Sequence, residues 1–91
     1  MRVRYTEEAI ADVEEILLYI AERNLTAAEI VSMAIEQTAD RIGSFPHSSQ
    51  ATDEPDVRMA PVGRFPYLLF YRVNRNEIWI VRIRHAARLR P

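Results

Sequence analysis

The spacing of hydrophobic and polar positions changes at about residue 57 of this chain. Before that point most apolar residues recur every three or four positions, and after it they alternate with polar residues or form short runs. A period of three to four is typical of amphipathic helices, and alternation is typical of strands. The sequence therefore predicts a mainly helical first part and a β-sheet in the second part.

The first part predicts one short strand and two helices. Residues 2–5 (RVRY) alternate, as in a strand with one buried face, and Thr6 is a suitable N-cap for a helix that ends near residues 23–24. The sequence TAAE at 26–29 is a capping box for a second helix, which we expect to end at Gly43 with the glycine as a left-handed C-cap. Two helices joined by so short a turn form an antiparallel hairpin.

The second part predicts a loop and three strands. Residues 44–56 contain two prolines and many small polar residues, which favour a loop. Strands are expected at 57–63, 67–73 and 77–85, with the NRN stretch at 74–76 as a tight turn. The predicted fold class is α+β: an N-terminal strand, an antiparallel helical hairpin, and a three-stranded antiparallel meander, with the strands in one sheet.

Alternation along the last strand predicts which of its side chains face the core. Trp79, Val81 and Ile83 share one face, which we expect to be buried, and His85 has the same parity at the end of that face. The opposite face then carries Ile80, Arg82 and Arg84. Unless a bulge interrupts the strand, the two arginines point away from His85.

The amino-acid composition is that of a folded domain and excludes several kinds of functional site. With 91 residues, 48% apolar and 27% charged, the chain resembles an ordinary folded protein, and we expect residues 1–91 to form one domain. The absence of cysteine excludes disulfides, thiolate metal sites and a thiol nucleophile. His47 and His85 lack metal-ligand spacing, and two glycines form no phosphate loop, so neither a metal nor a cofactor is expected. No apolar stretch suggests a membrane span or a leader, so we expect a cytoplasmic protein.

Charge is divided unevenly along the chain. Residues 1–56 hold four arginines and twelve acids, whereas residues 57–91 hold eight arginines and one acid, Glu77. Every basic residue is an arginine, whose planar guanidinium can bind a carboxylate or phosphate through two hydrogen bonds. This pattern favours an acidic partner; an equal alternative is that the two parts neutralise each other within one fold. Because the helices carry the negative charge, direct sequence-specific DNA binding is not expected.

Several stretches, taken in their order and spacing, resemble the RelE/ParE toxin superfamily and its ParE branch most closely. They are AIADVEEILLYIAERN in the first helix, FP after the second, Arg58 on the next strand, RFPYLLFYRV, and the final IVRIRHAAR. The resemblance implies a β-α-α-β-β-β fold and a toxin of a type II toxin–antitoxin system. It also implies a hetero-oligomer with a cognate antitoxin that carries a DNA-binding N-terminal domain.

The resemblance implies two surfaces and two alternative activities. ParE-type members resemble poisons of DNA gyrase that act by binding, whereas RelE-type members cut messenger RNA on the ribosome. The residues implied in target binding are Arg58, Arg64, Tyr67, His85, Arg88 and Arg90. Those implied in antitoxin binding are Arg72, Arg82, Arg84, Ile80, Ile16 and Ile20. A nuclease would instead depend on His85, Arg58 and Arg64.

The supply of titratable groups favours gyrase inhibition over RNA cleavage. Attack by the RNA 2′-hydroxyl needs a base, an acid and cations around the phosphate. After residue 56, only His85 titrates near neutrality, and there is no lysine. We therefore expect a binding-type inhibitor in preference to an enzyme, with ribosome-dependent cleavage of messenger RNA as the alternative. Two further alternatives stay open. In the first, His85 has only a structural role, in which it binds a backbone carbonyl and holds the tail in place. In the second, the whole chain is a non-toxic antitoxin-binding module, as its acidic loop 44–56 suggests.

Overall fold

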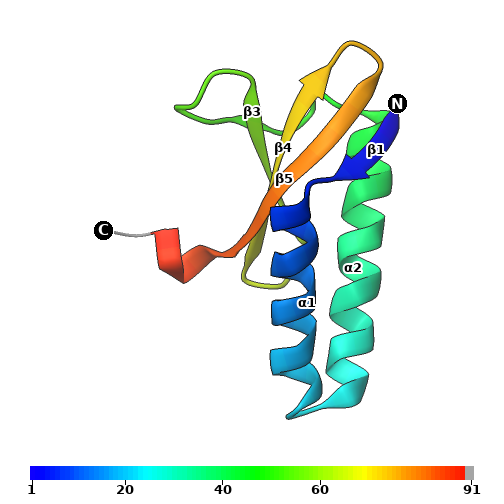
Figure 1. Cartoon of the computed structure of the whole chain (residues 1–91), viewed down its shortest axis with the longest axis vertical. Helices are drawn as coiled ribbons and strands as arrows, with labels where there is room; N and C mark the ends of the chain where they lie inside the picture. Colours follow the sequence, from blue (N-terminus) through cyan, green and yellow to red (C-terminus); the bar gives the residue numbers. More distant parts are fainter. Residues whose placement is uncertain (90–91) are drawn as a thin grey trace.

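The computed structural model describes the backbone of residues 1–89 and the side chains of residues 1–87. It has two layers, a five-stranded sheet and a helical hairpin packed on one of its faces (Figure 1). The predicted α+β fold class and the order of its elements are confirmed. In chain order the elements are β1 (Arg2–Tyr5), α1 (Glu7–Ala21), α2 (Leu25–Ser44), β2 (Gln50–Ala51), β3 (Val57–Pro61), β4 (Tyr67–Asn74), β5 (Glu77–His85) and the 3₁₀ helix η1 (Ala86–Leu89).

The sheet has the strand order β1-β5-β4-β3-β2. Strands β2 to β5 pair antiparallel with their neighbours, while β1 returns to the far edge and pairs parallel with β5. The sequence did not predict β2, because its two residues lie in a polar segment without alternation. This short strand ties the loop after α2 to the edge of β3.

Of the two N-caps predicted from the sequence, only that of α1 is confirmed. Thr6 accepts a hydrogen bond from the Ala9 N–H at 3.1 Å, as expected of the N-cap of α1. The capping box predicted at 26–29 is wrong, because α2 begins earlier and Asn24 is its N-cap. The Asn24 Oδ1 accepts from the Ala27 N–H at 3.0 Å.

Gly43 has a different role from the one predicted. It lies inside α2 and does not adopt a left-handed conformation, so the expectation of a glycine C-cap is wrong. A Cβ at this position would lie 3.2 Å from both the Met1 carbonyl oxygen and the Val3 Cγ2. The glycine therefore allows the start of the chain to pack closely against the end of α2.

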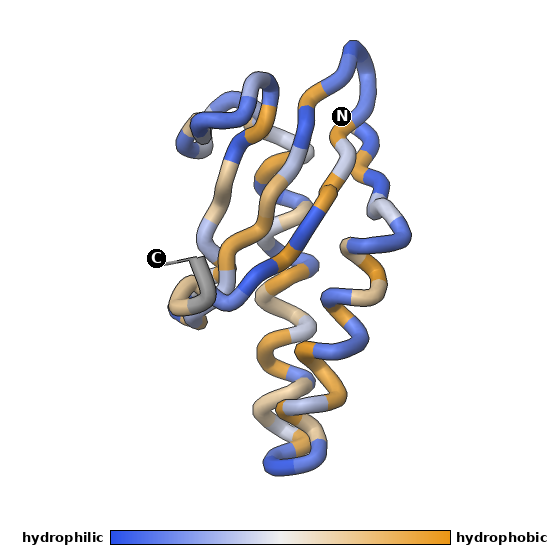
Figure 2. The backbone as a smooth tube through the Cα atoms, turned by 60° about the vertical axis from the view of Figure 1, so that its left-hand side comes forward, coloured by the Kyte–Doolittle hydropathy of each residue, from blue (hydrophilic) through white to orange (hydrophobic). Residues whose placement is uncertain are grey.

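The core lies between the hairpin and the sheet. Hydrophilic stretches gather in the loops and at the tip of the hairpin, while hydrophobic stretches run along the strands and one side of each helix (Figure 2). Full burial of one large aliphatic side chain stabilises a fold by about 2 kcal/mol. The side chains with no more than 2% exposure are Ala9, Ile42, Ala60, Val62, Leu69, Tyr71, Ile78, Ile80 and Ile83.

A β-bulge in β5 changes which of its side chains face the core. Phe70 on β4 pairs with Arg82, but the next residue, Tyr71, pairs with Ile80, so Val81 is an extra residue on β5. Ile78 and Ile80 are buried before the bulge and Ile83 after it. The expectation that Trp79 and Val81 belong to the core is therefore wrong. Alternation could not reveal the bulge, because IWIV is apolar on both faces.

Candidate functional site

The second half of β5 has a free edge that α1 covers. Strand β1 pairs only with Glu77–Ile80, so β5 has no neighbouring strand on that side beyond Ile80. The start of α1 supplies the missing partners: the Thr6 hydroxyl donates to the Val81 carbonyl at 3.1 Å, and Asp12 Oδ2 accepts from the Ile83 N–H at 2.9 Å. Side chains of a helix thus replace the hydrogen bonds of a strand.

Asp12 also forms an ion pair with the arginine beside this edge. Arg82 Nε lies 2.7 Å from Asp12 Oδ2, and Arg82 Nη2 lies 3.1 Å from Asp12 Oδ1. Burial by itself would raise the pKa of Asp12, whose side chain is only 13% exposed. The hydrogen bonds from Arg82 and Ile83, and the charges of Arg82 and Arg84, outweigh burial and lower this pKa below its ordinary value. Asp12 is therefore ionised at neutral pH.

Sequence reasoning did not single out Asp12, which lies off the apolar stripe of the first helix together with the neighbouring glutamates. One signal was present: Asp12 is the only aspartate in α1, and aspartate is less favourable inside a helix than glutamate. An aspartate inside a helix can therefore be a signal of a contact outside it.

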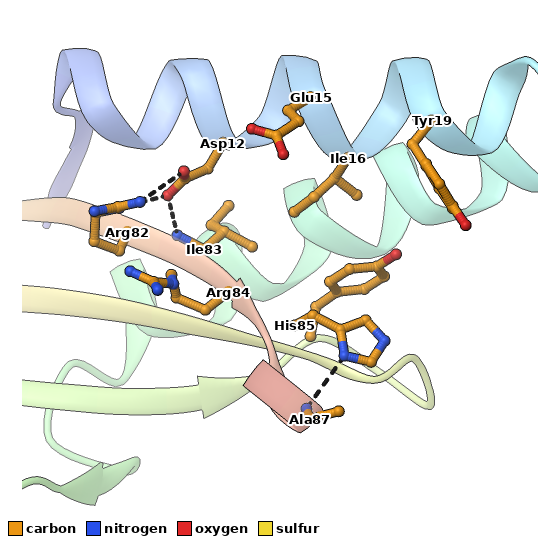
Figure 3. A pocket seen from close by; sticks show the side chains of 10 residues that line it. Asp12, Glu15, Ile16, Tyr19, Arg82, Ile83, Arg84, His85 and Ala87 are labelled. Atoms are coloured by element: carbon orange, nitrogen blue, oxygen red, sulfur yellow. Dashed lines mark hydrogen bonds and ion pairs between the residues drawn. The ribbon is translucent and has the colours of Figure 1, made fainter. Parts of the chain in front are cut away.

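A groove of about 510 Å³ opens between α1 and the end of β5 (Figure 3). One wall comes from α1, from which Ile16 and Tyr19 point toward His85. The other wall comes from the end of β5 and the start of β4. The residues that line the groove are Asp12, Glu15, Ile16, Tyr19, Tyr67, Arg82, Ile83, Arg84, His85 and Ala87.

His85 is held at the end of the groove by two contacts. Its ring meets the ring of Tyr67, its partner across β4 and β5, edge to face with centroids 5.4 Å apart. Its Nδ1 accepts a hydrogen bond from the Ala87 N–H at 3.2 Å. Neutral imidazole has one acceptor nitrogen, so this bond places the proton on Nε2. The Nε2–H is then the donor group of the ring.

The residues predicted to bind the target lie at two ends of the sheet. Tyr67 and His85 line the groove, and Arg64 is exposed in the preceding turn, which the Ala86 N–H joins to β5 through the Pro66 carbonyl at 2.8 Å. The Arg88 side chain and the whole of Arg90 lie outside the described residues.

Arg58 is far from this group, so the residues implied in target binding do not lie together at one end of the sheet. Arg58 pairs with Tyr71, four positions along β4 from Tyr67, or about 13 Å. Its Nη1 donates to the carbonyls of Ser49 at 2.7 Å and His47 at 3.3 Å. Arg58 thus holds the loop after α2 against the sheet.

The residues predicted to bind the antitoxin also divide. Ile16, Arg82 and Arg84 line the groove, and Ile20 packs partly buried against the core. Arg72 does not line the groove; its Nη2 lies 2.8 Å from Glu54 Oε1. Ile80 is fully buried, so its expected place on a contact surface is wrong.

One groove therefore receives side chains from both predicted sets. Alternation predicts that Arg82 and Arg84 point away from His85, but all three line the same groove. The covering of the β5 edge by α1 explains the difference, because a groove that runs along a strand edge can be lined by side chains from both faces; the bulge at Val81 comes before all three residues and leaves their alternation unchanged.

Two other kinds of site are missing from the described part of the chain. Residues 1–87 contain no group of three or more histidine, aspartate and glutamate side chains placed to hold a metal ion. Neither α1 nor α2 combines the length and hydrophobicity of a membrane-spanning helix. That the protein needs no cofactor stays a prediction.

Comparisons with known proteins identify a family and a matching fold. Residues 3–90 match the family model described as the ParE toxin of the type II toxin–antitoxin system parDE. Toxin RelE2 of Caulobacter vibrioides is 32% identical over 88 residues, which cover 97% of this chain and 98% of that protein. A solved structure of the chromosomal ParDE TA system from P. aeruginosa matches with a TM-score of 0.82 at 23% identity, over 93% of this chain and 95% of that one.

Proposed function

The chain belongs to the family of ParE toxins of type II toxin–antitoxin systems, and from this membership we propose that it inhibits DNA gyrase by binding and is held inactive by a cognate antitoxin. In this proposal residues 1–91 act as one toxin domain in the cytoplasm. The antitoxin carries its own DNA-binding N-terminal domain, and the two proteins form a hetero-oligomer.

The groove between α1 and β5 is the proposed docking site of the antitoxin. Ile16 and Tyr19 offer apolar contacts on one wall, and Arg84 offers a guanidinium on the other. Arg82 already binds Asp12, so Arg84 is the arginine that an acidic side chain of the antitoxin would meet. A segment that orders only on binding suits such an open groove, because its folding free energy is coupled to the contact.

The observation that carries the proposal of binding without chemistry is the hydrogen bond on His85. RNA cleavage needs a group that takes up the proton of the 2′-hydroxyl. His85 is the groove residue whose ordinary pKa lies closest to neutrality, and its acceptor nitrogen is already used by the Ala87 N–H. A histidine held in this way supports a contact surface, with Tyr67, Arg64 and His85 as target contacts.

Ribosome-dependent cleavage of messenger RNA is the second candidate function. The observation in its favour is the gathering of His85, Tyr67, Arg84 and Glu15 around one groove. This set includes a histidine, a carboxylate and a cation, which are the group types that phosphodiester cleavage uses. The matching family model has a ParE name and the relative from Caulobacter vibrioides has a RelE name, so the target must be decided by experiment.

A paired assay tests the proposal. The purified protein is added to a gyrase supercoiling and cleavage assay, and in parallel to ribosomes programmed with a defined message. We expect inhibition of gyrase and an intact message. Cleavage of the message together with normal supercoiling would show that the second candidate is correct.

Expression in a bacterial host without the antitoxin tests the non-toxic alternative. The acidic loop at 44–56, which motivates that alternative, is bound to the sheet by Arg58, by Arg72 and by the Tyr71 hydroxyl, which donates to the Pro46 carbonyl at 2.8 Å. We expect growth to stop on expression. A host that grows normally while the protein still binds its antitoxin would support a binding module.

A further inference from the structure

We propose that Asp12 is a positioning residue for the groove: it fixes the free edge of β5 to α1 and thereby sets how Arg84 and His85 face the α1 wall. This role concerns the geometry of the groove and does not depend on whether gyrase or the ribosome is the target. It goes beyond the proposed function, because Asp12, which also lines the groove, is assigned there neither to the antitoxin contacts nor to the target contacts.

Strand β5 needs support at the point where Asp12 meets it. The bulge at Val81 interrupts the ladder with β4, and β1 has ended one residue earlier. On the side away from β4, the Ile83 N–H is left without a strand partner, and a buried amide without a partner is unfavourable. Asp12 supplies that partner at 2.9 Å.

Asp12 is itself held rigidly. Its two carboxylate oxygens accept three hydrogen bonds, one from the Ile83 backbone and two from Arg82, and only 13% of the side chain is exposed. Its lowered pKa keeps the carboxylate charged at neutral pH, which strengthens all three bonds. A group with so many partners has one orientation, so it fixes the distance between α1 and β5.

Both walls of the groove begin at the Asp12 contact. Ile16 lies one turn after Asp12 on α1, and Arg84 and His85 come directly after Ile83 on β5. The two walls thus diverge from the place where Asp12 joins the helix to the strand (Figure 3). Moving β5 away from α1 at this point would move Arg84 and His85 relative to Ile16.

A different role for Asp12 would be to stabilise the whole fold without shaping the groove. The two roles differ in which amides and side chains a substitution of Asp12 would affect. Loss of general stability speeds the opening of all core amides, whereas loss of a positioning contact changes the Ile83 amide and the His85 ring selectively. The experiment must therefore compare signals within the folded protein.

The test is NMR spectroscopy of the intact chain, well below its unfolding temperature, with Asp12→Asn, Asp12→Ala and Asp12→Glu. The matched control is Glu14→Gln, which removes the same charge from an exposed position of the same helix, outside the groove. The signals measured are the Ile83 amide exchange rate, the His85 ring resonances, and the exchange rate of the Leu69 amide as an internal reference.

We expect Asp12→Ala to speed Ile83 exchange about tenfold relative to Leu69 and to shift the His85 ring resonances. Asp12→Asn should give a smaller change, Asp12→Glu should keep part of the wild-type spectrum, and Glu14→Gln should leave both signals unchanged. If Asp12→Ala does not fold, the Asn and Glu variants decide the question. Equal changes at Ile83 and Leu69, or an unshifted His85 ring, would overturn the proposal.

Discussion

Tyr67 and His85 lie opposite each other on β4 and β5, and their rings meet edge to face with the ring planes 85° apart. Such aromatic contacts contribute about 1 kcal/mol beyond the burial of area. The pair belongs to one wall of the groove at the end of the sheet, and α1 supplies the facing wall. Changes to this groove, or to the elements that hold it, should therefore alter function and stability in separable ways.

Substitution of Tyr67 separates contact from chemistry. Tyr67→Phe keeps the ring that touches His85 and removes only the hydroxyl, so we expect gyrase inhibition to change less than about threefold. Tyr67→Ala removes the ring and should weaken inhibition by about tenfold or more, because the aromatic contact and its buried area are lost. A dose–response curve of supercoiling inhibition measures both. A loss of about a hundredfold in Tyr67→Phe would mean that the hydroxyl takes part in a reaction.

Arg84 should contribute to antitoxin affinity more than an exposed arginine outside the groove. Arg84→Ala should weaken the complex with the co-expressed antitoxin by about tenfold, since a guanidinium–carboxylate hydrogen bond across a groove is worth about 1.5 kcal/mol. The control is Arg41→Ala, which removes an exposed arginine from α2, outside the groove. Isothermal titration at two salt concentrations measures both variants, and equal losses would show that only net charge matters.

The Asp12 carboxylate should make stability depend on acid pH. Its pKa is lower in the folded than in the unfolded state, so its stabilising contribution is complete above the unfolded pKa and is lost as pH falls through the folded pKa. Near neutral pH, Asp12→Asn should lower the free energy of unfolding by about 1–2 kcal/mol. This value allows for solvent screening of the ion pair, because Arg82 is partly exposed. The other charged groups that act on the Asp12–Arg82 ion pair are Arg84, Glu8 and Glu15.

Urea unfolding at a series of pH values checks this dependence. The difference in unfolding free energy between the wild type and Asp12→Asn should shrink as the pH falls below about 4, because the wild-type carboxylate then becomes protonated. A difference that stays constant from neutral to acid pH would show that the charge of Asp12 contributes nothing.

The turn between β4 and β5 offers a stabilising substitution. Arg75 has a φ of +42°, in the left-handed region that disfavours residues with a Cβ. Arg75→Gly should therefore raise the free energy of unfolding by about 0.5–1 kcal/mol, after allowing for the greater freedom of glycine in the unfolded chain. Arg41→Gly, at a helical position, is the contrasting variant and should destabilise. Thermal unfolding measures both, and a lower melting temperature for Arg75→Gly would contradict the expected relief of strain.

The order of elements could be predicted from the sequence because it depends on local signals. Thr6 as an N-cap, the helical period that comes after it, and the turn at 74–76 each act within a few residues. The details that were wrong depend on distant contacts. Gly43 is required by β1 packing against α2, and the bulge at Val81 is invisible in a run that is apolar on both faces.

The candidate site was predictable only in part, for the same reason. Tyr67 and His85 could be identified and do lie together, because they pair across a predicted hairpin. Arg58 was misplaced because its position along the sheet depends on the register of β3. Asp12 was missed because its partners, Arg82 and Ile83, are about 70 residues away and approach it only after α1 has folded onto the β5 edge.

The most direct measurement of the central claim, that the groove acts by contact and without breaking a bond, is the activity of His85→Gln. Glutamine can still donate and accept hydrogen bonds but cannot transfer a proton near neutrality. We expect His85→Gln to inhibit gyrase supercoiling within about tenfold of the wild type. Cleavage of a ribosome-bound message by the wild type, lost by about a hundredfold or more in His85→Gln, would contradict that claim.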